Sequence, residues 1–202
     1  MKEMKNVLPR AATMFVIFTL LCGVAYTAIV TGIAQLIFPK QANGSIIEVD
    51  GVKYGSELLG QYYTDDAHMM GRVMNLDVST YQDAEGNTLM YSAPSNLSPA
   101  SEEYEALIAQ RIEKIRTSNP ERGDEPIPVD LVTASGSGLD PAISPAAAEY
   151  QVPRIAAASG RTEEDVRNVI AQCTTGRFLG IFGEETVNVL KVNLMLDGIP
   201  SK

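Results

Sequence analysis

The sequence predicts an α+β protein with a single N-terminal transmembrane helix, followed by one mixed α/β extracytoplasmic domain with a small sheet. Two observations lead to this prediction. No charged residue occurs from Ala11 to Pro39, whereas charged and turn-forming residues recur through the rest of the chain. In that remainder, apolar residues follow the strand period in some stretches and the helix period in others. We therefore assign residues 1–10 to a cytoplasmic N-terminus, 11–38 to the transmembrane helix and 41–202 to the extracytoplasmic soluble domain.

The uncharged run is long enough to cross a bilayer, because a hydrocarbon core about 30 Å thick needs about 20 apolar helical residues. A cleaved signal peptide is the alternative, but its apolar core is only about 7–15 residues long, and no clean A-x-A site follows this run. Lys2, Lys5 and Arg10 precede the run, while Lys40 and Lys53 follow it in a stretch that also carries acidic residues. The positive-inside rule therefore predicts a single-pass protein with its N-terminus in the cytoplasm.

The charge of the predicted domain limits the kinds of partner that it can bind. The chain has 16 basic and 25 acidic residues, and residues 1–40 hold four of the basic and one of the acidic ones. The domain therefore has 12 basic and 24 acidic residues, a net charge of −12. Such a domain repels nucleic acid and anionic lipid. It could concentrate cations near a pore, or the charge could simply keep a solvated surface soluble.

The domain begins with strand and turn signals. The stretch SIIEVDGVKY (residues 45–54) has two β-rich runs around Asp50-Gly51, which predicts a hairpin with a two-residue turn. Residues 64–98 are rich in turn-forming residues and are expected to form an irregular, partner-facing loop. Val129 to Thr133 is expected to be a short strand. Val187 to Leu196 is expected to be a terminal strand, with residues 176–183 supplying its neighbour.

Three helices are expected between these strands. Ser98 or Ser101 can cap the first, which runs to about Arg116 with apolar residues at helical spacing. The second starts at Ser144-Pro145, is kinked by Pro153 and ends at Gly160. The third is capped by Thr162. Cys173 lies in its apolar pattern and is expected to be buried, and it lies too far from Cys22 in the predicted organisation to form a disulfide.

The residues offer little catalytic chemistry. Ser135 and Ser137 lie in a Ser-Gly-Ser-Gly loop that matches neither G-x-S-x-G nor a P-loop, so a tight turn is the simpler interpretation. Asp130 and Asp140 flank this loop and could bind a cation, although turn or cap roles are more common for Asp. A Ser-His-Asp site would have to use His68, the only histidine. These residues therefore predict a non-catalytic domain and no metal site.

Four stretches together are similar to a known family. They are GSELLGQYY (Gly55–Tyr63), PSNLSP (Pro94–Pro99), PVDLVTASGSGLDPAISPAAAEYQVPRIA (Pro128–Ala156) and VNVLKVNLMLD (Val187–Asp197). The chain resembles the C subunit of the bacterial Kdp-type potassium-transporting ATPase. It departs from the family pattern at residues 68–74, at residues 94–97 and at Ala142.

The resemblance implies a non-catalytic accessory subunit of an ATP-driven potassium-uptake pump in the bacterial plasma membrane. The implied partners are a P-type ATPase subunit and a channel-like, potassium-binding subunit. ATP and potassium would act at the level of the complex, with no cofactor bound tightly by this chain. A family proposal makes the subunit a catalytic chaperone that raises the ATPase subunit's affinity for ATP, with Gln151 implicated in nucleotide binding.

The predicted topology conflicts with that nucleotide role, because cytoplasmic ATP would not reach an extracytoplasmic Gln151. We therefore expect Gln151 and Arg154 to hold local geometry or a subunit contact. Ser95, Asn96, Asp130, Ser135, Ser137 and Asp140 complete the set of motif residues expected to serve structure or partner contacts. Two alternatives remain open: a free-standing membrane-anchored binding domain, and an extracytoplasmic hydrolase that uses His68.

Overall fold

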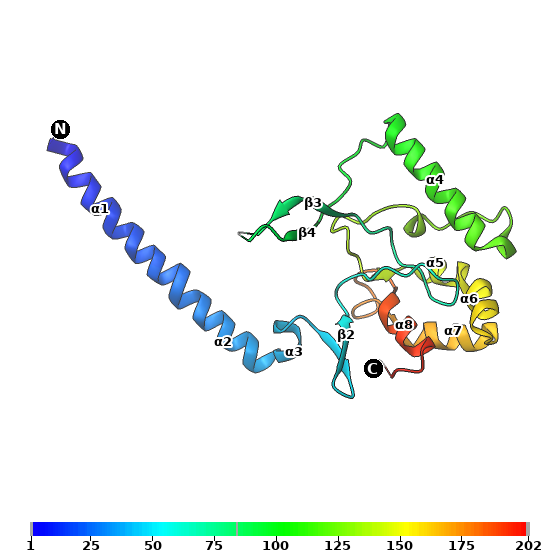
Figure 1. Cartoon of the computed structure of the whole chain (residues 1–202). Helices are drawn as coiled ribbons and strands as arrows, with labels where there is room; N and C mark the ends of the chain where they lie inside the picture. The colour runs from blue at the N-terminus through cyan, green and yellow to red at the C-terminus, as the bar shows by residue number, and fades with distance from the viewer. Residues whose placement is uncertain (1, 84, 201–202) are drawn as a thin grey trace. The chain divides into compact units, whose positions relative to one another are not determined.

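The computed structural model describes residues 2–83 and 85–200, and the chain forms two compact units, Met1–Ile46 and Ile47–Lys202. The first unit is helical (Figure 1). It consists of α1 (Lys2–Phe18), the π-helical segment η1 (Thr19–Tyr26), α2 (Thr27–Ile37) and the short α3 (Pro39–Ala42). Residues Val7–Ile37 form a helix that is long and apolar enough to cross a membrane. At 1.5 Å per residue its 31 residues extend about 46 Å, so the predicted apolar helix is confirmed.

The second unit has mixed α/β structure, as predicted. A hairpin pairs β1 (Ile46–Val49) with β2 (Val52–Ser56). Asp50 and Gly51 both have positive φ, at 51° and 78°, as the expected two-residue hairpin turn requires. Ile47 packs with Leu190 and Leu194 in a small core cluster of its own.

A second hairpin lies within residues 64–98, which were expected to be irregular. Strands β3 (Leu76–Gln82) and β4 (Thr88–Ser92) are antiparallel, with Leu76 opposite Ser92 and Gln82 opposite Thr88. The prediction was wrong here because the turn-forming residues at 83–87 connect two strands instead of interrupting an open loop. Asp83 accepts hydrogen bonds from the backbone N–H groups of Glu85 and Asn87, at 3.0 and 2.7 Å, which closes the connection.

A three-stranded antiparallel sheet has the order β5-β7-β6. Its strands are β5 (Ala142–Ile143), β6 (Thr174–Thr175) and β7 (Thr186–Asn188). The expected long terminal strand is wrong, because only three residues are extended before α8 (Val189–Leu196) begins. The Asn188 side chain caps this helix by accepting from Lys191 N at 3.0 Å. The expected neighbouring strand at 176–183 is wrong too, since β6 precedes that segment.

The predicted helices are present. The first is α4 (Glu102–Ser118), capped by Ser101, which accepts from Tyr104 N at 3.2 Å. The second is divided into α5 (Pro145–Tyr150) and α6 (Val152–Ser159), and Gly160 ends it with φ 68°. The third is α7 (Glu163–Gln172), where Thr162 forms a capping box with Asp165. The expected strand at 129–133 is wrong, because Val129–Leu131 form a 3₁₀ turn, η3, and Pro120–Arg122 form another, η2.

The main core lies among α4 to α8 and the three-stranded sheet. Its fully buried members include Ile143, Val152, Ile155, Val166 and Val187. Helix α6 packs against α7, and α7 packs against α8, so these three helices form a continuous packed group (Figure 1). Cys173 at the end of α7 is buried, as expected, and burial raises the pKa of its thiol to about 11.

Candidate functional site: a buried polar clamp

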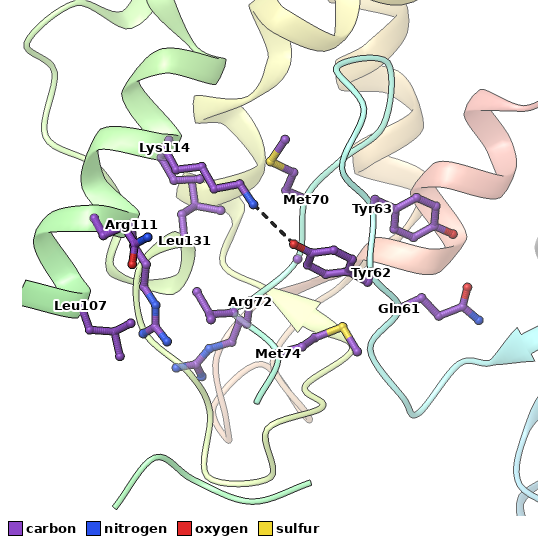
Figure 2. A pocket seen from close by; sticks show the side chains of 14 residues that line it. Gln61, Tyr62, Tyr63, Met70, Arg72, Met74, Leu107, Arg111, Lys114 and Leu131 are labelled. Atoms are coloured by element: carbon purple, nitrogen blue, oxygen red, sulfur yellow. Dashed lines mark hydrogen bonds between the residues drawn. The ribbon is translucent and has the colours of Figure 1, made fainter. Parts of the chain in front are cut away.

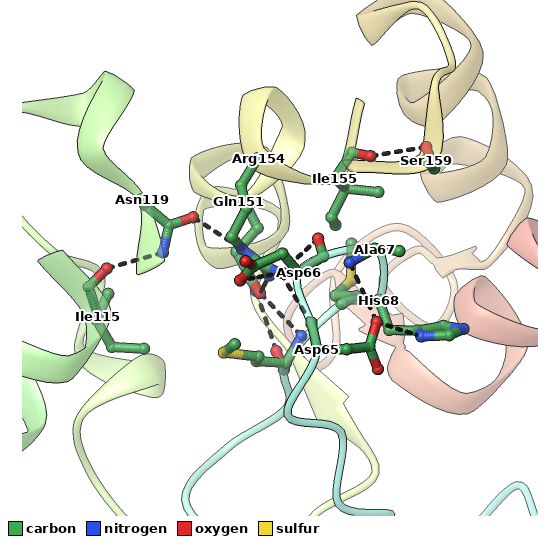
Figure 3. Close-up of polar contacts among 12 residues, drawn as sticks. Asp65, Asp66, Ala67, His68, Ile115, Asn119, Gln151, Arg154, Ile155 and Ser159 are labelled. Atoms are coloured by element: carbon green, nitrogen blue, oxygen red, sulfur yellow. Dashed lines mark hydrogen bonds and ion pairs between the residues drawn. The ribbon is translucent and has the colours of Figure 1, made fainter. Parts of the chain in front are cut away.

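The break between α5 and α6 places Gln151 in the core, where its side chain is 1% exposed. Pro153 lies in the first turn of α6, where a missing N–H costs no helical hydrogen bond. The helix is therefore interrupted at Gln151, two residues before the predicted kink. This interruption directs the Gln151 amide toward the segment 65–70, which lies far from it in sequence (Figure 3).

Gln151 pairs with the backbone of that segment as a neighbouring strand would. Its Oε1 accepts from Met70 N at 2.8 Å, and its Nε2 donates to Met70 O at 3.0 Å. Nε2 also donates to Ala147 O at 3.1 Å. Both polar ends of the amide are therefore engaged within the protein, and neither is exposed to solvent.

Asn193 of α8 does the same for the preceding residue. Its Oδ1 accepts from Met69 N at 2.7 Å, and its Nδ2 donates to Met69 O at 2.9 Å. Asn193 is 0% exposed, and so is Met69. Two side-chain amides, one from the break between α5 and α6 and one from α8, thus satisfy two consecutive buried backbone units, which would be costly to leave unpaired.

Arg154 completes this group, which we call the polar clamp and define as Asn119, Gln151, Arg154 and Asn193. Its guanidinium donates to Asn119 Oδ1 at 3.2 Å and to Gln151 Oε1 at 2.8 Å. It also donates to the carbonyl oxygens of Asp65 and Asp66, at 3.2 and 2.7 Å (Figure 3).

The charge of Arg154 is held in the interior by these contacts. Burial lowers the pKa of Arg154, and the neighbouring Asp66 and Asp65 carboxylates act in the opposite direction. The Asp66 carboxylate lies 3.9 Å from the guanidinium, and Arg154 itself is only 4% exposed. An arginine in this position remains charged, so the carbonyl and carboxylate oxygens around it act as its solvation shell.

His68 links the segment 65–70 to the end of α8. Its Nδ1 lies 2.7 Å from Asp65 Oδ1, and its Nε2 lies 2.9 Å from Asp197 Oδ1. Burial of the ring opposes its protonation, but the hydrogen bonds with Asp197 and Asp65 outweigh that effect and raise the pKa of His68. Because each ring nitrogen already faces a carboxylate, neither is directed at a hydroxyl that it could activate.

The Ser-Gly-Ser-Gly loop is a second structural junction. Ser135 Oγ accepts from Gly138 N at 3.0 Å, and Ser137 Oγ accepts from Leu139 N at 3.2 Å. Gly138 has φ 72°, and a Cβ there would lie 2.8 Å from the carbonyl oxygens of Asn75 and Ala93. The loop therefore uses its residues for a tight turn and a close backbone approach, as the turn interpretation predicts.

The two aspartates that flank this loop have local partners. Asp130 Oδ2 accepts from Ser144 N at 2.8 Å. Asp140 Oδ1 accepts from Ala142 N at 3.1 Å, and its Oδ2 lies 3.3 Å from the Arg72 guanidinium. Within residues 2–83 and 85–200, no group of three or more His, Cys, Asp or Glu residues is placed to hold a metal ion.

The structure brings some predicted residues together and leaves others apart. Gln151 and Arg154 meet directly, at 2.8 Å. Ser95 and Asn96 are part of neither the polar clamp nor the Ser-Gly-Ser-Gly loop. Asn96 is exposed and has φ 54°. Sequence reasoning missed Asn119, Asn193 and Asp197. A signal existed for Asn193, which is a polar residue inside the apolar run VLKVNLML, but it points to the core only once that run is treated as a helix.

The fold and the polar clamp together define a class of protein. Its members carry an apolar helix long enough to cross a membrane and a small α+β domain, and buried polar side chains of that domain hold the domain's own backbone in place. The comparisons narrow this class. The family model described as "K+-transporting ATPase, c chain" matches residues 8–198.

Close relatives agree with that match. The chain is 60% identical over 199 residues to the Potassium-transporting ATPase KdpC subunit of Clostridium botulinum (strain Alaska E43 / Type E3), covering 98% of this chain and 99% of the relative. It is 62% identical over 183 residues to the subunit of the same name from Clostridium perfringens, covering 91% and 92%. The chain belongs to the family of K+-transporting ATPase c chains.

Proposed function

We propose that this chain is a non-catalytic accessory subunit of an ATP-driven potassium pump and is needed for assembly and activity of the complex. The family assignment supports potassium transport. The observation that favours a bracing role over a catalytic one is the pairing of Gln151 with both backbone groups of Met70. A side chain used in this way fixes the path of a segment that runs from the exposed Asp65 and Asp66 to the buried Met69 and Met70, and an assembly subunit needs such a defined shape.

The proposed topology places the N-terminus in the cytoplasm and the domain outside, in the bacterial plasma membrane. Lys2, Lys5 and Arg10 precede the apolar helix and support this orientation. A protease added to intact spheroplasts should then remove the domain, whereas inside-out vesicles should protect it. Digestion with the opposite pattern would reverse the orientation and reopen the question of access to cytoplasmic ATP.

The role of Gln151 in this proposal is to hold residues 65–70, not to bind nucleotide. Its amide is buried, and its donors and its acceptor are already used. Binding ATP through this amide would require breaking the contacts to Met70 and leaving buried backbone groups unpaired, which costs about 1–3 kcal/mol per group. The partners of the segment that the clamp supports are the P-type ATPase subunit and the channel-like potassium-binding subunit.

The acidic surface suggests a further contribution to transport. With 12 basic and 24 acidic residues, the domain would raise the local concentration of potassium if it lies over the outer mouth of the channel-like subunit. The effect would weaken with ionic strength, because salt screens exposed charges over about 8–10 Å.

Affinity purification of the chain from its native membrane in mild detergent, after potassium starvation, tests the proposal. Mass spectrometry should find a P-type ATPase and a channel-like subunit in fixed stoichiometry with it. Recovery of the chain alone under these conditions would contradict the subunit role and favour a free-standing binding domain.

A further inference from the structure

A cavity of about 330 Å³ lies between α4 and the segment Gln61–Met74 (Figure 2). None of the four clamp residues lines it, although Met70, whose backbone pairs with Gln151, does. Met70, Leu107 and Leu131 give it an apolar lining, and the Tyr62 ring lies across it from α4. Pockets for small ligands are typically about 300–1,000 Å³, mostly apolar with a few polar groups. The cavity meets that description, and all its lining residues belong to the second unit.

The charge of the cavity is opposite to that of the domain. Arg72, Arg111 and Lys114 line it, and none of the residues that line it is acidic. In a domain with a net charge of −12, a concave surface with three cations and no carboxylate stands apart from its surroundings. A concave site lined by one sign of charge attracts ligands of the other sign.

These cations also have spare hydrogen-bonding capacity. Arg111 is half-buried, and the one contact found for its guanidinium in the described part of the chain is to Val132 O at 3.0 Å. Burial lowers the pKa of Arg111, as expected for a cation without a nearby carboxylate. Lys114 donates only to Tyr62 Oη, at 3.4 Å, among the described residues. Arg72 pairs with Asp140 through one terminal nitrogen, and its other terminal nitrogen donates to Thr133 Oγ1 at 3.3 Å and Ala134 O at 3.2 Å. Its Nε is buried without a partner in that same part of the chain, so this is the donor that Arg72 has open.

We infer that this cavity binds an anionic amphiphile, in which a phosphate or carboxylate faces the three cations and a short apolar body contacts Met70, Leu107 and Leu131. An anion would neutralise the half-buried Arg111 and occupy donors that the protein leaves open. The ligand could be a phospholipid of the surrounding membrane or a soluble amphiphile. Binding is measured on this chain alone, so the inference stands apart from the proposed pump role.

The test uses the full chain in phosphatidylcholine nanodiscs with ¹³C-labelled methionine methyl groups. Hexyl phosphate is the soluble probe, and part of the phosphatidylcholine is replaced by phosphatidylglycerol in the lipid arm. We expect saturable shifts of the Met70 and Met74 methyl signals, while Met195, which lines a different cavity, stays unchanged. A response to hexyl phosphate alone identifies a soluble ligand, a response to phosphatidylglycerol alone identifies a lipid, and each supports the site.

Arg111→Gln should weaken binding at least tenfold, because it removes a cation and its charge-assisted hydrogen bond to the anion. Arg116→Gln removes a cation from the same helix outside the cavity and should leave the affinity unchanged. Lys114→Gln replaces Arg111→Gln if the latter loses the buried Met69 signal of the folded domain. The inference is overturned if neither probe saturates, if hexanol acts like hexyl phosphate, if ATP shifts the same signals at lower concentration, or if the cavity variants bind as well as wild type.

Discussion

His68 joins two acidic residues from distant parts of the chain, with Asp65 Oδ1 2.7 Å from one ring nitrogen and Asp197 Oδ1 2.9 Å from the other. Asp197 follows α8 directly, while Asp65 belongs to the segment that the polar clamp supports. The imidazole is therefore a link between the C-terminal helix and this segment. The same contact makes the link dependent on pH.

The first prediction concerns that dependence. Because the pKa of His68 is raised in the folded state, its pairing stabilises the domain fully below about pH 6.5, the usual His pKa, and this stability is lost as the pH rises through the folded pKa. The partly exposed pairs should contribute about 0.2–1 kcal/mol each. Urea unfolding of the full chain in detergent should show wild type exceeding His68→Gln at pH 5.5, with a smaller difference at pH 8.5. A difference that is the same at both pH values would contradict it.

The second prediction concerns Asn193. Asn193→Ala leaves the buried N–H and C=O of Met69 without partners, so we expect a loss of about 2–6 kcal/mol, at about 1–3 kcal/mol for each of the two groups. Asn168→Ala on the exposed face of α7 is the matched control and should change stability by less than about 0.5 kcal/mol. Equal urea midpoints for the two variants would show that the Met69 contact does not matter for stability.

The third prediction concerns the start of α7. Thr162 accepts from Asp165 N at 3.1 Å, and Thr162→Ala should therefore cost about 1 kcal/mol of stability. Thr162→Ser keeps the capping oxygen and should retain most of it. If the alanine and serine variants unfold at the same urea concentration, the hydroxyl is not the stabilising group.

The fourth prediction separates two glycines of one loop. Gly138→Ala combines φ 72° with a Cβ 2.8 Å from two backbone oxygens, whereas a Cβ at Gly136 meets nothing within 4 Å. Strain at such a position costs about 1–3 kcal/mol before the clash is added. Thermal unfolding should show a clear loss for Gly138→Ala and little change for Gly136→Ala; similar values for both would refute the close-approach role.

Signals that act over a few residues predicted their elements well. Asp50-Gly51 gave the first hairpin, and Ser101, Ser144 and Thr162 marked the starts of helices. These succeeded because caps and tight turns are decided by the chain's own neighbouring atoms. The uncharged run predicted the long apolar helix for a similar reason, since length and composition suffice.

Longer-range features escaped the same reasoning. The run VNVLKVNLML is short and mostly apolar. The spacing of its apolar residues therefore did not distinguish a strand from a buried helix. The polar clamp could not be predicted from the sequence either, because contacting residues such as Asn193 and Met69 are separated by 124 positions. Gln151 and Arg154 were singled out by the family motif, but their partners at 65–70 lie in a stretch that resembled an open loop.

The central claim is that Gln151 holds the 65–70 segment and does not bind nucleotide. The most direct measurement is ATP-dependent potassium pumping by the purified complex containing Gln151→Ala, titrated with ATP, with exposed Gln172→Ala as the matched control. Gln151→Ala should reduce pumping, or the yield of assembled complex, by the same factor at low and saturating ATP, while Gln172→Ala behaves as wild type. A defect of Gln151→Ala that excess ATP restores would contradict the claim and support the catalytic-chaperone role.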